Sequence, residues 1–298
     1  MFSQQAKGRS ETEPAQFIKE GIKAFVRTSP LNRIPMMDNQ IIYDEPLVQF
    51  AGGDDPIFTE YKTIIDPTHL TPGEALAQTF NKSPEDIPAH LSVISWVLPF
   101  TRKIRGTNRR HTLTPSHLWL NAYCYGEKFN DAMREHVEEL LTEMGYLAVA
   151  PVLQPYFKIE YAHISEKGYY SNWSERHIAY VAGLGTFSLS DGFITERGIA
   201  HRCGSAITDL VLPVSPRTAK NPYSNCLFYI NGKCKSCIAR CPVGAISENG
   251  HDKIKCLDKL YLSEKYKVEA SACGLCQTKV PCEFRNPTKN LKKEAEQD

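Results

Sequence analysis

The sequence predicts a mixed α/β (α+β) fold in which a layered core of strands and helices precedes a cysteine-rich C-terminal module. An apolar run at 91–100 has the length and β-branched content of a buried strand. Apolar residues at helical spacing predict an amphipathic helix at 127–144, and a second buried strand is expected at 146–152. Eight of the ten cysteines then fall within 226–282.

The composition suits a chain that forms one large or two smaller domains. It has 298 residues, of which 23% are charged, and a formal net charge of +1. The chain lacks the excess of basic residues that would indicate a nucleic-acid partner, and no apolar run in it is long enough to cross a membrane. The N-terminal residues contain no apolar segment that directs export. We therefore expect a cytoplasmic protein with no membrane partner.

The N-terminal region is expected to wrap around the core. Apolar residues at helical spacing predict a helix at 15–26. Residues 29–74 are rich in Pro, Gly and Asp, which predicts a long irregular segment that covers either the core surface or a site. The expected domains are this wrap at residues 1–85, a cofactor-binding core at 86–218, the cysteine module at 219–290 and a polar tail at 291–298.

A basic stretch at 101–111, TRKIRGTNRRH, leaves the end of the first buried strand. Charge runs of this kind are usually solvated loops, and this one could also contact phosphate or carboxylate groups of a ligand. The helix that follows is expected to end at Gly145, a residue type that favours the position after a helix. Prolines at 151 and 155 end the second strand.

Glycines and hydroxyl side chains are concentrated just before the cysteine module. A helix that starts at Ser174 is expected to end at Gly183. Gly183-Leu184-Gly185 predicts a turn whose backbone can lie close against a flat partner, because glycine has no Cβ. Strands are expected at 192–195 and 203–211, so a ligand-sized surface precedes the module.

The module's cysteines form two groups of four, each with a C-x-x-C step. The first group ends in Cys241-Pro242, as does the bacterial iron–sulfur run, whose last cysteine ligates the other cluster. This spacing predicts two 4Fe-4S clusters that form an electron relay. Crossed ligation assigns Cys226, Cys234, Cys237 and Cys282 to the first cluster, and Cys241, Cys256, Cys273 and Cys276 to the second.

Structural zinc and disulfides are the alternative interpretations of these cysteines. Two C-x-x-C pairs can hold zinc, but zinc does not require the C-x3-C-P tail or so many thiols in one stretch. Disulfides require an oxidising compartment. An insertion at 227–233 stretches the first spacing, and no proline follows Cys282, so the outermost ligands depart from the usual pattern.

Cys124 and Cys203 lie outside the module. A free buried cysteine usually behaves as a small hydrophobic residue. Cys203 carries a second hypothesis, because the preceding His201 and Arg202 could lower the pKa of its thiol and make it reactive.

Several motifs, in this order, resemble epoxyqueuosine reductase and, more distantly, the reductive dehalogenases. They are AGLG at 182–185, FIT at 193–195, SAITDLVLP at 205–213 and the two-cluster module, and the resemblance covers roughly residues 90–285. It implies a nitroreductase-like core joined to a ferredoxin-like module, with a base-off cobalamin held between them. The residues that it places beside this cofactor are Gly183, Gly185, Phe193, Gly204 and Ser205.

The resemblance also indicates the proton donor. Where epoxyqueuosine reductases carry an aspartate, this sequence has Tyr169, followed by Tyr170, and reductive dehalogenases use a tyrosine helped by a cation. Either tyrosine is a candidate donor, with Arg202 or Lys167 stabilising the phenolate. The alternative is a pair of tyrosines that only pack against neighbouring strands.

The resemblance implies an oxygen-sensitive oxidoreductase that passes electrons through two 4Fe-4S clusters to cobalamin for a reductive step on a small-molecule substrate. Ferredoxin or flavodoxin would be its electron donor. The near-zero net charge and the lack of the helical-repeat extension of many epoxyqueuosine reductases argue against a tRNA substrate. Two alternatives stay open: an electron-transfer protein that activates the corrinoid of a partner, and a core whose clusters are only structural.

Overall fold

The computed structural model of the chain describes residues 12–161, 168–261 and 272–289. Lys167 and the tail expected at 291–298 therefore lie outside the described residues.

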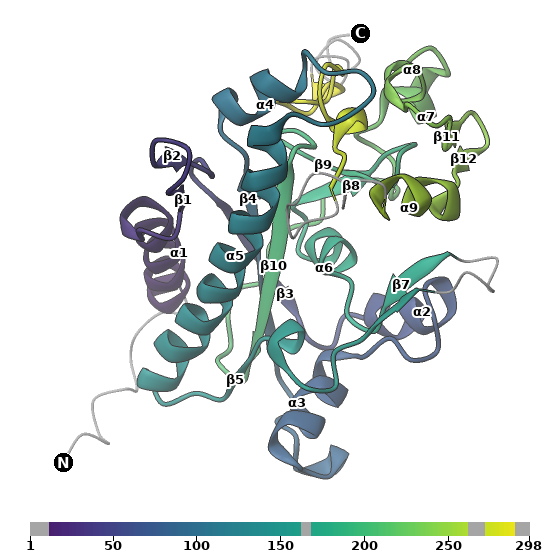
Figure 1. Cartoon of the computed structure of the whole chain (residues 1–298). Helices are drawn as coiled ribbons and strands as arrows, with labels where there is room; N and C mark the ends of the chain where they lie inside the picture. The colour runs from purple at the N-terminus through teal and green to yellow at the C-terminus, as the bar shows by residue number, and fades with distance from the viewer. Residues whose placement is uncertain (1–11, 162–167, 262–271, 290–298) are drawn as a thin grey trace, which may run out of the picture.

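An antiparallel four-stranded sheet, with the order β3-β4-β10-β5, forms the centre of the fold (Figure 1). β4 and β10 pair over their full length, from Ser92 opposite Thr208 to Pro99 opposite His201. Every residue of β4 is buried, because helices cover both faces of the sheet. The four strands, in chain order, are β3 (Leu47–Gly52), β4 (Ser92–Pro99), β5 (Ala148–Val149) and β10 (His201–Thr208).

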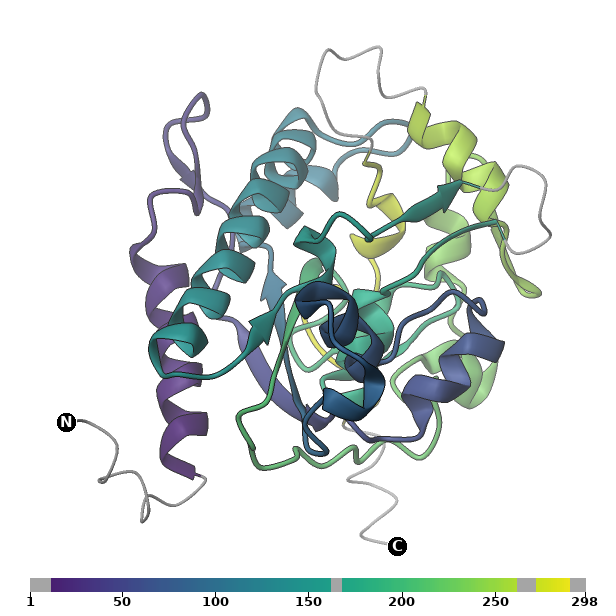
Figure 2. The ribbon, with the colours of Figure 1, turned by 90° about the horizontal axis from the view of Figure 1, so that it is seen from below.

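Helices α1 (Thr12–Thr28) and α5 (His117–Glu143) lie side by side on one face of the sheet, as Figure 2 shows. Helix α6 (Glu175–Val181) packs on the other face, where α2 (Ile57–Ile64) and α3 (Pro72–Phe80) complete a second hydrophobic cluster. The molecule is thus layered as helix, sheet and helix.

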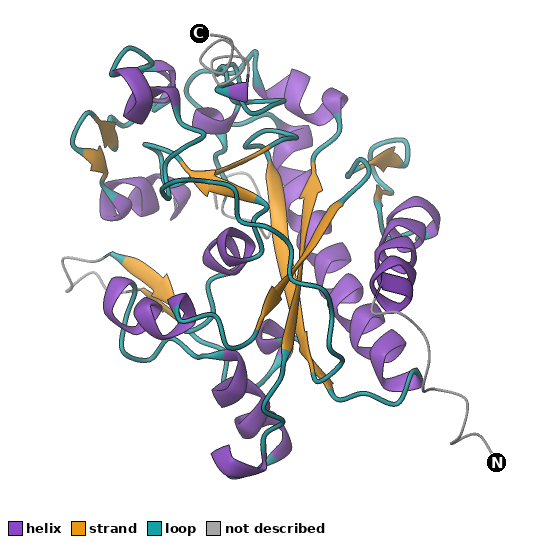
Figure 3. Ribbon diagram, turned by 180° about the vertical axis from the view of Figure 1, so that it is seen from behind, coloured by secondary structure: helices purple, strands orange, loops and turns teal. Residues whose placement is uncertain are grey.

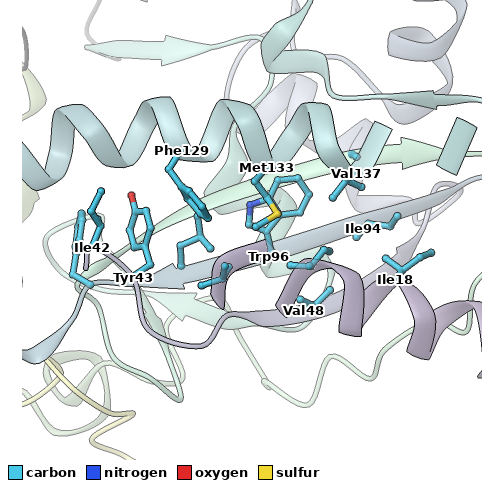
Figure 4. Packing of buried hydrophobic residues seen from close by; sticks show 14 of the residues in the cluster. Ile18, Ile42, Tyr43, Val48, Ile94, Trp96, Phe129, Met133 and Val137 are labelled. Carbon is cyan, nitrogen blue, oxygen red and sulfur yellow. The ribbon is translucent and has the colours of Figure 1, made fainter. Parts of the chain in front are cut away.

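The hydrophobic cluster under α5 shows why this long helix is fixed in place (Figure 4). Phe129, Met133 and Val137 follow one another at helical spacing, are fully buried and pack against the sheet with Trp96. The indole N–H of Trp96 donates to Asn130 Oδ1 at 2.9 Å, so this large side chain is buried without an unpaired donor. Burial of each such apolar side chain contributes about 1.5–3 kcal/mol.

The strand at 91–100 and the helices at 15–26 and 127–144 are confirmed as β4, α1 and α5. Helix α5 begins earlier than expected, because the Ser116 hydroxyl accepts the Trp119 backbone N–H at 3.1 Å and caps the helix there. Gly145 follows the helix with a φ of +88°, as expected. The second strand is shorter than expected, since only Ala148–Val149 pairs with β10 before a 3₁₀ turn, η2 (Pro151–Leu153).

The prediction of irregular structure at 29–74 is wrong for the centre of this segment. β3 pairs with β4 and adds a strand to the core sheet, with Val48 and Phe50 buried on one side. The Pro, Gly and Asp residues that suggested a loop flank this strand instead of interrupting it.

The basic stretch is likewise not a solvated loop, because it forms helix α4 (Arg102–Asn108). Arg105 is buried, and its guanidinium donates to the Glu283 backbone oxygen at 3.1 Å. Arg109 forms an ion pair with the Glu283 carboxylate at 2.8 Å. These cations hold the end of the cysteine module on the core, so the structure gives them a protein partner.

The cysteine module packs on one end of the core and is built from short elements (Figure 3). The buried guanidinium of Arg240 donates to the backbone oxygens of Leu275, Thr278 and His111, which ties two parts of the module to the loop after α4. No helix among the described residues has the length and apolar content to span a bilayer. The module's elements are α7 (Leu227–Asn231), α8 (Ser236–Arg240), β11 (Ile246–Ser247), β12 (Gly250–His251), α9 (Lys253–Tyr261) and η4 (Leu275–Gln277). The remaining elements are β1 (Arg33–Ile34), β2 (Gln40–Ile41), η1 (Pro84–Asp86), β6 (Ile159–Tyr161), β7 (Tyr169–Ser171), β8 (Gly185–Phe187) and β9 (Phe193–Thr195).

Candidate functional site

A cavity of about 770 Å³ lies between the core and the cysteine module. Side chains from α5, β7, β9 and β10 line the core side, and cysteines line the module side. This volume lies within the range of small-molecule and cofactor sites, about 300–1,000 Å³.

The structure brings the eight module cysteines together as two adjoining sets. One set shares a small pocket under α7, and burial together with the other three thiols of that set raises the pKa of Cys282. The second set lines the large cavity, and Cys276 lies on the border because it also lines the small pocket. We call Cys226, Cys234, Cys237 and Cys282 the first set, and Cys241, Cys256, Cys273 and Cys276 the second set.

These sets do not have the geometry of a single-ion site. Within the described ranges, no group of three or more His, Cys, Asp or Glu side chains is arranged to hold one metal ion. A four-iron cluster is larger than one ion and keeps its thiolates farther apart, so the donor chemistry of each set, four sulfurs, suits such a cluster. Burial raises the pKa of Cys237 to about 11 and of Cys256 to about 12, so ligation at either would release a proton.

A buried donor without an acceptor lies beside the second set. Trp119 is 1% exposed, and its indole N–H has no hydrogen-bond partner among the described residues. Gly274, at a φ of +61°, packs against this indole, where a Cβ would approach the ring to 2.1 Å. The loop from Cys273 to Cys276 therefore lies on the edge of Trp119, and the free N–H fits an acceptor held by that loop.

Helix α5 presents a polar stripe to the cavity. Trp119, Tyr123, Glu127 and Asp131 recur every four residues and line it together with Arg134. Sequence reasoning missed Trp119 and Tyr123 because it placed the start of the helix too late. The regular spacing of polar and aromatic residues was the signal that could have found them.

Arg134 is the centre of a buried ion network behind this stripe. Its guanidinium contacts the carboxylates of Glu127 at 3.2 Å, Asp131 at 2.6 Å and Glu175 at 3.1 Å. Burial raises the pKa of Glu175, against the opposing effects of Arg134 and of Ser205, whose hydroxyl donates to this carboxylate at 2.6 Å. The network fixes the start of α6 relative to α5 and β10.

The structure separates the two candidate donors, because neighbouring residues of a strand face opposite ways. Tyr169 lines the cavity, whereas Tyr170 packs in the hydrophobic cluster around α6. Burial raises the pKa of Tyr169 to about 12, and Arg176 is the cation that opposes this shift. Arg176 was not among the cations considered from the sequence, and the help expected from Arg202 or Lys167 stays a prediction.

Arg202 instead contacts two residues of the polar stripe on α5, Tyr123 and Glu127. It lines the cavity, forms an ion pair with Glu127 and lies over the Tyr123 ring, with the guanidinium carbon 4.3 Å from the ring centroid.

Among the five residues expected beside the cofactor, Phe193 lines the large cavity. Gly183 and Gly185 line a separate cavity of about 570 Å³. Their close partners are backbone atoms of Pro216 and Ile194, so the missing Cβ atoms make room for the protein's own chain and not for a flat ligand.

Gly204 and Ser205 occupy β10 behind the cavity wall. Ser205 accepts the indole N–H of Trp173 at 2.9 Å, in addition to its bond with Glu175. Gly204 faces the opposite side of the sheet, where a Cβ would lie 2.4 Å from the Trp96 indole. We therefore interpret Gly204 as a packing residue.

Gly204→Ala is expected to lower the free energy of unfolding by about 1–3 kcal/mol, because the added methyl overpacks the core against Trp96. Urea unfolding followed by circular dichroism measures this change. Gly73→Ala is the matched control, since a Cβ there meets open space in α3, and it should leave stability unchanged or slightly higher. Equal stability of the two variants would contradict the packing role.

The reactive-thiol hypothesis for Cys203 is wrong. Cys203 lines the cavity, but burial, together with Glu175, raises the pKa of its thiol to about 12, despite the nearby arginines. Cys124 is a partly exposed free cysteine on α5.

Solved structures similar to this chain are epoxyqueuosine reductases and reductive dehalogenases, the families that its motifs resemble. An epoxyqueuosine reductase with an epoxyqueuosine-modified tRNA-Tyr stem loop aligns over 92% of this chain and 66% of that chain, with a TM-score of 0.47 and 15% identity. The enzyme from Bacillus subtilis aligns with the same coverage, a TM-score of 0.45 and 16% identity.

A catabolic reductive dehalogenase in complex with 3-bromo-4-hydroxybenzoic acid covers 69% of this chain and 27% of that chain, with a TM-score of 0.42 and 21% identity. This chain thus spans slightly less than two thirds of the length of the epoxyqueuosine reductases. No protein-family model and no curated protein matches the sequence.

One of these structures corrects the expectation that tRNA is disfavoured. The epoxyqueuosine reductase reported above, which is among the solved structures that align with this chain, holds an epoxyqueuosine-modified tRNA stem loop. Net charge is a property of the whole chain and does not describe the charge of one surface, so it was a poor reason to exclude tRNA.

Proposed function

We propose that this chain is a cytoplasmic iron–sulfur oxidoreductase with two 4Fe-4S clusters and a cobalamin in the large cavity. The observation that carries the proposal is that the second set of thiols lines the same cavity as Tyr169. Electrons and a proton would then reach a bound substrate at one place. On this proposal residues 86–218 form the cofactor-binding core and residues 219–290 the ferredoxin-like cluster domain.

The position of the two sets supports a direction for the proposed relay. In the first set no thiol lines the large cavity, whereas all four thiols of the second set do. The first set would hold the cluster that receives electrons, and the second set the cluster that passes them to the cavity.

Cobalamin, when bound, supplies low-valent cobalt for the reductive step. The residues that would hold it are the aromatic and polar side chains of the wall, among them Phe193, His201 and Arg202. Tyr169 would donate a proton to the reduced substrate, and Arg176 would stabilise the phenolate that remains.

The free indole N–H of Trp119 would donate to a sulfur of the second cluster. Such a hydrogen bond stabilises the reduced form of the cluster, so its loss makes the reduction potential more negative. For a bond of ~1 kcal/mol, Trp119→Phe is expected to lower the reduction potential of the second cluster by about 40 mV and to leave that of the first cluster unchanged. Redox titration followed by electron paramagnetic resonance measures both potentials. Trp96→Phe is the control, because the Trp96 indole N–H donates to Asn130, away from the thiols. Equal shifts in the two variants would remove this role.

Anaerobic reconstitution followed by cobalamin titration tests the proposal. We expect iron and sulfide to be incorporated, followed by stoichiometric cobalamin binding with a change in the cobalt absorption. Reduction of 3-bromo-4-hydroxybenzoic acid and of an epoxyqueuosine-modified stem loop then compares the two substrate chemistries. Iron incorporation without cobalamin binding would instead indicate an electron-transfer protein, and a colourless zinc protein would refute the proposal.

A further inference from the structure

An exposed aromatic patch covers the first set of thiols and has no part in the chemistry proposed above. Tyr223, Tyr229 and Ile230 are 39%, 46% and 47% exposed, and Phe228 lies beside them. The rings of Tyr223 and Tyr229 have centroids 4.2 Å apart, and those of Phe228 and Tyr229 are 5.5 Å apart. We call these four residues the α7 patch. Most of it belongs to the insertion at 227–233 that stretches the first cysteine spacing.

The α7 patch is in direct contact with the first set. Cys226 is the residue that precedes α7, and Phe228 lines the small pocket together with Cys226, Cys237 and Cys282. Tyr229 packs edge to face against Phe228. Phe228 therefore connects the exposed rings of the α7 patch to the pocket that the first set of thiols shares.

The segment of sequence that contains the α7 patch carries positive charge without acidic residues, and Asp191, which lies near Tyr229 from outside this segment, pairs with His251. From Leu210 to Ser247 the sequence contains no Asp or Glu, although the whole chain has nearly equal numbers of acidic and basic residues. The cations in this stretch are Arg217, Lys220, Lys233, Lys235 and Arg240.

Two of these cations are available to a partner. Arg217 pairs with Asp55, Lys235 pairs with Glu248, and Arg240 is buried. Lys220 and Lys233 are exposed and form no ion pair with a described residue. In sequence they flank the α7 patch on either side. An apolar, aromatic centre with a charged rim is the composition of a protein–protein interface.

We propose that the α7 patch is the docking surface for a small acidic electron-carrier protein. Lys220 and Lys233 attract the acidic surface of the carrier, and the aromatic side chains contact the region around its redox group. The carrier gives up one electron, the first cluster gains it, and no bond is formed or broken. This inference rests on the proposed function, because it needs a cluster on the first set of thiols.

The test is stopped-flow reduction of the reconstituted chain by an acidic flavodoxin in its hydroquinone form, with dithionite as a reductant that needs no docking surface. In the Lys220→Glu/Lys233→Glu variant, reduction by flavodoxin at low salt should slow by ~10-fold or more, and its salt dependence should flatten. Dithionite should reduce this variant at the rate of the parent chain. A Lys82→Glu/Lys103→Glu variant is the control, because it makes the same charge change at two exposed lysines outside the cysteine module, one after α3 and one in α4.

The outcomes separate the two proposals. If dithionite reduces the chain but flavodoxin reduces the Lys220→Glu/Lys233→Glu variant and the control variant equally fast, the docking inference is refuted. The proposed clusters would still be supported in that case. If dithionite reduces nothing in the parent chain, the proposed function fails and the docking inference fails with it. Binding of a tRNA stem loop that depends on Lys220 and Lys233, with an unchanged flavodoxin rate, would assign the surface to nucleic acid and overturn the inference.

Discussion

Replacing Cys282 with serine is expected to remove half of the iron from the reconstituted chain and leave the other half in place. Cys282 shares a small pocket with Cys226, Cys234 and Cys237, which lie far from it in sequence, and burial together with these three thiols raises the pKa of Cys282. Loss of one thiolate should prevent assembly of the first cluster only. Iron and sulfide analysis, with electron paramagnetic resonance of the reduced protein, measures the result.

Cys256→Ser is the complementary change, because Cys256 belongs to the second set. It should remove the other half of the iron and also stop electron delivery to the large cavity. Cys124→Ser is the control, as Cys124 lies outside both sets on α5, and it should retain all the iron. Loss of the same spectroscopic signal from Cys282→Ser and Cys256→Ser would show that the thiols are not divided between two clusters in this way.

Spacing along the chain was sufficient to predict which cysteines line the same pocket, because ligands of one cluster are constrained by short loops and by a known crossing pattern. Their assignment to two clusters stays a prediction. The strongly periodic segments were predictable for a similar reason. The local sequence indicates burial for both the mostly apolar β4 and the amphipathic α5.

Features that depend on distant partners were not predictable. β3 is a strand because β4 lies beside it, and its flanking Pro, Gly and Asp residues suggested a loop. Arg105 is buried because the Glu283 backbone, far along the chain, accepts its hydrogen bond. In both cases the decisive contact joins segments that the local pattern does not connect.

The glycines of AGLG illustrate a different limit. The sequence correctly indicated a close backbone approach, and Gly183 does adopt a φ of +77°. It could not indicate what approaches, and the partners are the backbones of Pro216 and Ile194. The residues that line the large cavity come instead from the helical stripe on α5 and from Tyr169, whose orientation depends on tertiary packing.

Tyr169→Phe is expected to lower the rate of substrate reduction by ~10²- to 10⁴-fold, the usual contribution of a positioned proton donor. The matched control is Tyr170→Phe, because Tyr170 is the adjacent residue in β7 but lies outside the cavity, so it should retain nearly the full rate. Single-turnover reduction, with a chemical electron donor, of whichever test substrate the reconstituted parent chain reduces measures both variants. Similar rates in the two variants would remove Tyr169 from the mechanism and leave it as a packed side chain.

The pH dependence gives an independent check on the same residue. Burial raises the pKa of Tyr169 to about 12, so the folded protein keeps this phenol protonated above the ordinary tyrosine pKa of ~10. The donor should therefore stay competent across the neutral and mildly alkaline range. Because the unfolded chain releases this proton at lower pH, the stability contributed by the buried phenol is complete below about pH 10 and is lost as pH rises toward 12. Burial raises the pKa of other tyrosines as well, among them Tyr43 and Tyr61, so the difference between the parent chain and Tyr169→Phe is what ultraviolet titration must measure. The phenolate signal lost in Tyr169→Phe should belong to the late part of the titration, and loss of a signal near the ordinary pKa would contradict the burial of Tyr169.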